Sequence, residues 1–191
     1  GFGQGLFHFF NRNKKSLAID LKSDAGKAVF RRALENTDVL IENFGPGAVE
    51  RLGFGYEACK EINPGLVYCS LKGFMPGPYE HRPSLDNLVQ MMGGLAYMTG
   101  PTGQPLRAGA SVTDILGATY GALGVVAALR ERDQTGLGQN VRASLFEATS
   151  FLVGQHMSTA AITDAPVPPM PEGENPWTVY ELFTTADGDQ V

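Results

Sequence analysis

The chain has 191 residues, of which 43% are hydrophobic and 18% are charged. This is ordinary globular composition, and the length suffices for one domain and part of another. The formal net charge is −5 and the basic residues are scattered along the chain, which argues against a nucleic-acid or anionic-membrane partner.

Cysteine usage and the apolar runs place the chain in a soluble, reducing setting. Cys59 and Cys69 have no metal-ligand spacing around them, so we expect neither a disulfide framework nor a metal site. The N-terminal stretch lacks the features of a secretory signal, and the run Ile115–Leu129 is shorter than the about 20 residues of a membrane-spanning helix. We therefore expect a cytoplasmic protein. Because the chain starts without Met and ends just after a turn, we expect a piece of a longer polypeptide.

The first half of the chain alternates between strand and helix patterns. The expected strands are Ser16–Lys22, Asp38–Phe44 and Gly65–Phe74. One helix is expected to begin after a cap at Ser23 or Asp24, and a second helix to occupy Gly55–Asn63. The opening "GFGQG" has no strand before it, so it is only weak support for a phosphate-binding loop. The alternation predicts right-handed βαβ units and an α/β layered domain with a parallel sheet.

The second half adds three helices, a short strand and a linker. One helix is expected over Leu85–Met98, one behind Asp114, and one after a short strand around Val141. The proline-rich stretch that follows has no periodicity and is typical of an extended linker. We therefore divide the chain into a large domain (1–163), a linker (164–176) and the start of a smaller, truncated domain that opens with a hairpin (177–191).

Two loops after expected strands carry polar or glycine-rich segments. Glu42–Phe54 contains glycines that let a ligand approach the backbone, although a simple turn explains them equally well. His81, Arg82 and Asp86 lie close in sequence, but Ser84 beside them has no nucleophile-elbow context. We interpret these as solvated loop charges.

Asp114 stands at the head of a long segment of small and apolar residues. A carboxylate at a helix N-terminus is a favoured cap and is stabilised by the helix dipole. The same field would lower the pKa of Asp114 and keep it ionised, and the small residues behind it would let backbone close in and exclude water. An ionised carboxylate in a dry pocket can serve as a nucleophile or a base. The residues alone leave both interpretations, cap and nucleophile, open.

Five stretches in this order resemble family III CoA-transferases: "NRNKKSLAIDLKSDAGK", "DVLIENFGPGAVERLGFGYE", "INPGLVYCSLKGF", "GPYEHRPSLDNLVQMMGGLAYMTG" and "RERDQTGLGQNVRASLFEA". The resemblance implies a large Rossmann-like domain, a small domain and two subunits interlocked as a homodimer. It implies acyl-CoA and a small carboxylic acid as substrates, with coenzyme A thioesters passing through the site and no permanently bound cofactor or metal.

The resemblance also implies roles for individual residues. Asp114 aligns with the family nucleophile, which forms first a mixed anhydride and then a thioester with CoA. Asn43, Phe44 and Arg51 would border the adenine and the ribose phosphate of CoA, and Lys22 would meet phosphate.

One position separates the branches of this family. The related 2-methylacyl-CoA racemases carry a catalytic His where this chain has Leu85, so CoA transfer is favoured over racemisation. The formyl-CoA branch often has Tyr there, and the phrases "PLRAGASV" and "FLVGQHM" are most similar to members acting on C4–C5 dicarboxylates. A racemase-like isomerase and a non-catalytic CoA- or dinucleotide-binding module remain the alternatives.

Overall fold

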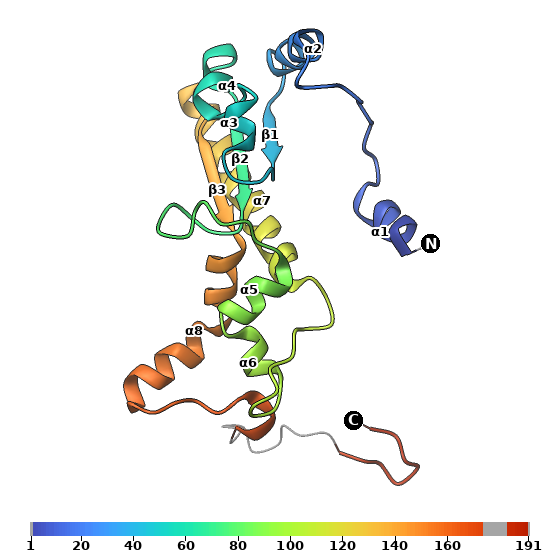
Figure 1. Cartoon of the computed structure of the whole chain (residues 1–191), viewed down its shortest axis with the longest axis vertical. Helices are drawn as coiled ribbons and strands as arrows, with labels where there is room; N and C mark the ends of the chain where they lie inside the picture. The colour runs from blue at the N-terminus through green and yellow to red at the C-terminus, as the bar shows by residue number, and fades with distance from the viewer. Residues whose placement is uncertain (1, 174–182, 191) are drawn as a thin grey trace.

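A computed structural model describes residues 2–173 and 183–190. Its centre is a parallel sheet in the order β1-β2-β3, formed by Val39–Glu42, Val67–Lys72 and Asn140–Ser144 (Figure 1). Cys69 of β2 pairs with Ile41 of β1 and with Val141 of β3. The predicted α/β class and the parallel pairing of the sheet are confirmed.

The helices follow the strands as βαβ units require. They are α1 (Phe2–Phe10), α2 (Asp24–Leu34), α3 (Ala48–Arg51), α4 (Tyr56–Ile62), α5 (Asp86–Met92), α6 (Leu95–Thr99), α7 (Val112–Thr135) and α8 (Leu145–Thr163), with a 3-10 turn at Met170–Glu172. Ser23 caps α2 by accepting a hydrogen bond from the Gly26 N–H, as predicted.

Side chains alternate across β2, so each face of the strand builds its own core. Val67 and Cys69 face α7 and pack against Val125 and Ala128. Tyr68 points the other way into a cluster that joins α2, α3, α4 and the segment before β2: Leu34, Val49, Phe54, Cys59 and Leu66. The result is a layered arrangement with helices on both faces of β2.

The glycines of α7 set its distance from the sheet. A Cβ on Gly121 would stand 2.7 Å from Leu71 Cδ2, and a Cβ on Gly124 would stand 2.7 Å from Val141 Cγ1. Only a residue without a side chain lets the helix backbone come this close. The small-residue stripe is therefore a packing device against β2 and β3.

By length and composition alone, α7 would suffice to cross a membrane.

Two sequence-based predictions are wrong. Ser16–Lys22 is not a strand: within residues 2–173 and 183–190, this segment has no neighbouring strand with which to form a hydrogen-bonded ladder. The helix expected over Leu85–Met98 is broken into α5 and α6, since Gly94 adopts the left-handed region at φ +84° and ends the first helix. Phe2–Gly5, the described part of "GFGQG", lies within helix α1, in line with the weak support for a phosphate-binding loop.

The two ends of the chain extend away from this body. Figure 1 shows α1 set apart from the sheet and joined to α2 by an extended segment. Thr184 and Gln190 form an antiparallel bridge across a turn, in line with the hairpin expected at the end of the chain. Residues 174–182, which include part of the expected linker and the start of the expected small domain, lie outside the described residues. The domain boundaries therefore stay predictions.

Candidate active site

A cavity of about 1350 Å³ opens at the carboxyl ends of β1 and β2, where ligands bind in open α/β sheets. The loops that follow both strands form one wall, and the segment before α7 together with the first turns of α7 forms another. Leu6, Phe9 and Phe10 of α1 line its far side. The charged side chains that line the cavity are those of Lys72, Arg82, Arg107 and Asp114.

Asp114 lines this cavity from the first turn of α7, but it is not the helix cap. The helix begins at Val112 with Ser111 in the cap position, so Asp114 is the third helical residue. The cap interpretation from the sequence is wrong because the chain enters the helix three residues earlier than the charge pattern indicated. Asp114 itself is exposed to solvent, and the small residues of α7 pack on the sheet, not around the carboxylate.

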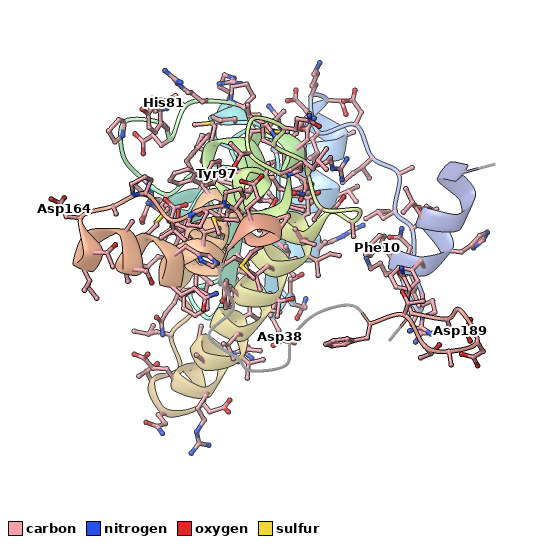
Figure 2. The ribbon with its side chains drawn as sticks, turned by 90° about the horizontal axis from the view of Figure 1, so that it is seen from below. Phe10, Asp38, His81, Tyr97, Asp164 and Asp189 are labelled. Carbon is pink, nitrogen blue, oxygen red and sulfur yellow. The ribbon has the colours of Figure 1, made fainter. Side chains whose placement is uncertain are left out.

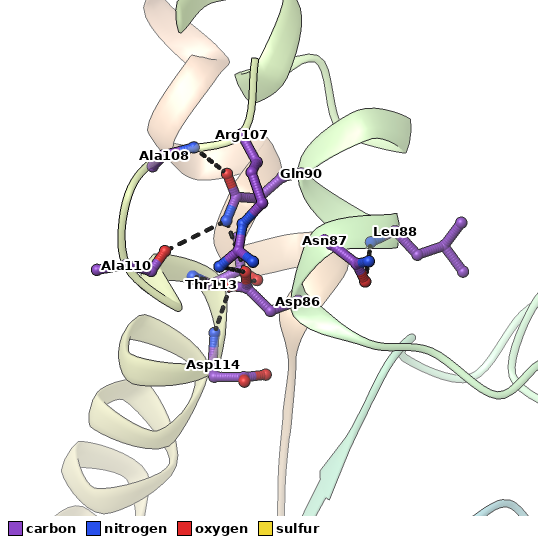
Figure 3. A network of polar contacts seen from close by, with 9 residues as sticks. All are labelled: Asp86, Asn87, Leu88, Gln90, Arg107, Ala108, Ala110, Thr113 and Asp114. Carbon is purple, nitrogen blue, oxygen red and sulfur yellow. Dashed lines mark hydrogen bonds and ion pairs between the residues drawn. The ribbon is translucent and has the colours of Figure 1, made fainter. Parts of the chain in front are cut away.

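The cap of α7 comes instead from α5. Asp86 Oδ1 accepts hydrogen bonds from Thr113 N (3.0 Å), Thr113 Oγ1 (2.7 Å) and Asp114 N (3.4 Å), and the residue is only 6% exposed (Figure 3). Asp86 Oδ2 accepts a hydrogen bond from Gln90 Nε2 at 2.6 Å and pairs with Arg107 Nη2 at 3.4 Å. A buried carboxylate therefore anchors the helix turn that carries Asp114.

The two carboxylates have pKa values that shift in opposite directions. Burial by itself would raise the pKa of Asp86, but the hydrogen bonds from Thr113, Gln90 and the Asp114 N–H lower it below the ordinary value. The pKa of Asp114 is raised by partial desolvation and by the negative charge of Asp86, while Arg107 opposes both. The pKa lowering expected from the helix dipole is thus corrected.

The residues expected to contact CoA fall into two groups. Asn43 and Phe44 line the cavity together with Asp114. Arg51 and Lys22 do not line the cavity. The Arg51 guanidinium lies beside Gly47, with Nη1 2.8 Å from the position that a Cβ on Gly47 would take. Lys22 is exposed to solvent, and its backbone N–H donates to the Asp20 side chain. Gly47 has φ +70° and leaves the Arg51 guanidinium room beside the loop.

A buried ion pair holds the loop that carries Asn43 and Phe44. Lys72 Nζ lies 2.8 Å from Glu42 Oε2 and donates a second hydrogen bond of 2.8 Å to the Phe44 carbonyl. Glu42 also accepts hydrogen bonds from Ser70 Oγ and from the Phe44 N–H. Sequence reasoning missed this arrangement, because Glu42 and Lys72 belong to different strands and no local pattern connects them.

Residues in and beside the segment before α5 differ in whether they face solvent or the site. The His81 side chain is 86% exposed and lies at the outer edge of the molecule, so its interpretation as a solvated group is confirmed (Figure 2). The same interpretation is wrong for Asp86, which is buried because α5 turns it towards α7. Leu85 lines the cavity and carries no titratable group. In the described part of the chain no three His, Cys, Asp or Glu side chains gather as a metal site would require.

The fold and the site together define an α/β protein with a carboxylate at the end of a ligand cavity. A family model described as CoA-transferase family III matches residues 1–191. The chain belongs to CoA-transferase family III, as the sequence resemblance predicted.

Relatives of assigned activity and solved structures agree with this membership. An acetyl-CoA:oxalate CoA-transferase of Acetobacter aceti is 41% identical over 84% of the chain and 42% of its own length. A formyl-CoA:oxalate CoA-transferase of Rhodopseudomonas palustris (strain TIE-1) is 44% identical over 73% of the chain and 33% of its own length. The crystal structure of a CAIB/BAIF family protein from Brucella suis superposes with a TM-score of 0.88 at 33% identity, over 96% of the chain and 49% of that protein. The chain thus spans less than half the length of these relatives.

Proposed function

We propose that this chain carries the nucleophile of an enzyme that moves CoA from an acyl-CoA donor to a carboxylic acid acceptor. One observation carries the proposal: Asp114 lines the same cavity as Asn43 and Phe44, two of the four residues that the family resemblance assigns to CoA. A CoA molecule held by that loop would lie in the same cavity as the Asp114 carboxylate. The family membership supports the same reaction class.

The proposed reaction uses Asp114 as a covalent carrier. Its carboxylate attacks the thioester carbonyl of the donor, forms a mixed anhydride and releases CoA thiolate. The thiolate attacks the aspartyl carbonyl, which gives an enzyme–CoA thioester and frees the donor carboxylate. The acceptor carboxylate then attacks this thioester, and the released thiolate takes the acyl group from the second anhydride. Asp114 is regenerated as a carboxylate.

We assign CoA recognition to the loop after β1 and to the start of α2. Asn43, Phe44 and Arg51 would border the adenine and the ribose phosphate, and Lys22 would meet phosphate. Lys72 stabilises the loop after β1 by donating a hydrogen bond to the Phe44 carbonyl. A lysine and an arginine near the phosphates would supply the charge-assisted hydrogen bonds that such groups prefer.

We propose a small dicarboxylate as the acceptor. Arg82 and Arg107 line the cavity with Asp114, so a second carboxylate on the acceptor has cationic partners there. The two relatives named above are CoA-transferases of oxalate, which is itself a dicarboxylate. Leu85 in place of a tyrosine, together with the phrases noted above, favours a C4–C5 acid over oxalate.

We further propose that the enzyme works in the cytoplasm as an interlocked homodimer, as the family resemblance implies. Apolar side chains exposed on α7 and α8 support contact with further protein: Leu123, Val126, Phe151 and Ile162 are each more than half exposed.

Trapping the aspartyl intermediates tests the mechanism. In the full-length gene product, hydroxylamine added during turnover should label Asp114, as detected by peptide mass spectrometry. Asp114→Ala should lose CoA exchange by at least about 10³-fold, since no anhydride can form. The exposed Asp133→Ala variant, near the C-terminal end of α7, is the control and should keep full activity. CoA exchange by Asp114→Ala at the wild-type rate would overturn the proposal.

The same preparation separates the alternatives. A racemase would exchange the α-proton of an acyl-CoA in heavy water, whereas a transferase would not. A binding module would show CoA affinity with neither reaction. A panel of acceptor acids with succinyl-CoA and acetyl-CoA, read by mass spectrometry, identifies the donor and the acceptor.

A further inference from the structure

Helix α7 begins without a side-chain cap of its own. The cap residue Ser111 makes no side-chain hydrogen bond to the first turn. The first N–H groups of a helix have no partners within the helix and need an outside acceptor. Asp86, which lies 27 residues before Thr113 in the chain, supplies it by accepting from Thr113 N and from Asp114 N.

The remaining bonds of Asp86 fix its orientation. The Thr113 hydroxyl donates to Oδ1, and the fully buried Gln90 amide donates to Oδ2. Gln90 in turn accepts from the Ala108 N–H at 2.8 Å and lies 3.5 Å from the Ala110 carbonyl. The segment that leads into α7 is thereby tied to the same carboxylate, as Figure 3 shows.

We propose that Asp86 is a positioning residue for CoA transfer, holding the first turn of α7 so that Asp114 faces the cavity. This inference rests on the proposed function of Asp114. Both oxygens of Asp86 accept hydrogen bonds from protein donors, so the proposed role is to hold the turn and not to contact substrate. Loss of its acceptor oxygens would leave the Thr113 and Asp114 N–H groups unpaired and the turn free to shift.

The charge of Asp86 has a second effect on the nucleophile. A fixed negative charge beside Asp114 disfavours its ionised form, and a carboxylate that holds a proton more tightly also bonds more readily to an acyl carbon. The other charges that face Asp114 are Arg107 on the segment before α7 and Lys72 and Arg82 on the cavity walls. All three are cationic, and Arg107 lowers the pKa of Asp114. Among the described residues of the site, Asp86 is the one whose negative charge counteracts them.

The experiment compares Asp86→Asn with Thr113→Val in the full-length gene product. Asp86→Asn keeps the shape but removes the charge and replaces one acceptor oxygen with an NH2 donor, so one set of hydrogen bonds to Asp86 is lost. We expect kcat for CoA exchange to fall about 10²-fold, as a displaced reacting group requires, with the KM for acyl-CoA within about 3-fold. The acid limb of its kcat/KM profile should move to lower pH, because Asp114 loses its like-charged neighbour.

Thr113→Val removes one donor to Asp86 and leaves the charge in place. We expect kcat to fall about 5- to 10-fold with the acid limb unmoved, and Thr113→Ser to restore the rate. The matched control is Asp133→Asn, the same chemical change at an exposed position near the C-terminal end of α7, which should alter neither rate nor profile.

Unchanged kcat in Asp86→Asn would overturn the positioning role, and a lowered kcat with an unmoved acid limb would overturn the effect of the Asp86 charge on Asp114. Thermal unfolding checks that each variant folds; if Asp86→Asn does not fold, the Thr113→Val and Thr113→Ser pair decides by loss and rescue of kcat. Asp114→Ala separates this inference from the proposed function. An active Asp114→Ala removes the proposed mechanism itself, whereas an inactive Asp114→Ala beside a fully active Asp86→Asn removes only the role of Asp86.

Discussion

At the scale of single residues, the site depends on two carboxylates in different environments. Asp86 is buried and hydrogen-bonded, so it stays ionised. Asp114 faces the cavity beside that charge, and its pKa is raised above the ordinary value. Two titratable groups pushed in opposite directions are characteristic of functional sites.

The raised pKa of Asp114 predicts both a pH profile and a stability effect. Only the ionised form attacks a thioester, so kcat/KM should fall as pH drops through a pKa above the about 3.9 of a free aspartate. A carboxyl whose pKa is higher in the folded state than in the unfolded state stabilises the fold when it is protonated, at pH values below its unfolded-state pKa. This contribution is lost as the pH rises through the folded-state pKa. Ionised Asp114 therefore adds no stability at pH 7.

Asp114→Asn separates the two effects. We expect activity to be lost while the free energy of unfolding at pH 7, measured by urea titration, drops by no more than about 0.5 kcal/mol, as for a surface substitution. A drop of several kcal/mol would show that Asp114 is structural.

Arg107 offers a test of the acceptor class. Its guanidinium has five donors, only one of which reaches Asp86, and its side chain is 48% exposed. In the full-length gene product, Arg107→Met should raise the KM for a dicarboxylate acceptor about 10- to 100-fold through loss of charge-assisted hydrogen bonds. The KM for a monocarboxylate should change by less than about 3-fold.

Arg82→Met is the comparison for Arg107→Met. Arg82 lines the same cavity, but its guanidinium stacks on Tyr79 at 4.6 Å, so a smaller rise is expected. Both variants should be assayed above the acid limb of the wild-type profile, because the loss of Arg107 also raises the pKa of Asp114. Equal effects on mono- and dicarboxylates would argue against a dicarboxylate contact.

At the scale of elements, α7 links the sheet to the site. One stripe of the helix packs on β2 and β3, and its first turn carries Asp114, the proposed nucleophile. The close approach of the helix depends on glycine, because a side chain on that stripe meets the strands. The position of Asp114 relative to the strand ends is therefore set by the packing of the whole helix.

A series of Gly→Ala substitutions measures this packing. Alanine favours a helix by up to about 1 kcal/mol over glycine. Gly154→Ala in α8, with open space around it, should gain most of this, and Gly117→Ala, whose nearest contact is 3.4 Å, should gain less. Gly124→Ala should destabilise by about 1–2 kcal/mol, because its Cβ meets the stiff Val141 side chain at 2.7 Å. Urea unfolding of the full-length gene product gives the order, and a stabilising Gly124→Ala would contradict it.

At the scale of the whole molecule, much apolar surface stays uncovered. Leu123 and Val126 on α7 are each 64% exposed, and Ile162 on α8 is 84% exposed. Contiguous exposed apolar surface marks sites of contact with other protein. Such contact would also cover the outer side of the helix that carries Asp114.

The chain of residues 1–191 expressed by itself should therefore bind a dye specific for apolar surface and self-associate in light scattering. The full-length gene product should do neither beyond forming a defined oligomer. The double variant Leu123→Glu and Val126→Glu should reduce self-association of the 191-residue chain. A monodisperse monomer of this chain without dye binding would contradict the prediction.

The sequence by itself was enough to predict the strands at Val39–Glu42 and Val67–Lys72, the helix of Gly55–Asn63, and the parallel α/β class. These follow from local hydrophobic periods and from cap and turn residues, which act within a few positions. The order of the five family-like stretches also identified the family and selected Asp114. By contrast, the unpaired Ser16–Lys22 depends on neighbours elsewhere in the fold, whereas the break at Gly94 has a local cause in the left-handed backbone of a glycine.

Only the tertiary structure decided how the site is held. The sequence pattern predicts Asp86 to be a solvated loop charge, because its partners Thr113 and Asp114 lie on another helix. The pair of Glu42 and Lys72 is likewise hidden in two separate strands. Hydrogen bonds and ion pairs over this separation leave no periodic trace in the sequence, since they depend on how the elements pack. The sequence determined which carboxylate is the candidate nucleophile, and the packing of α5 against α7 decided what holds it and which way its pKa shifts.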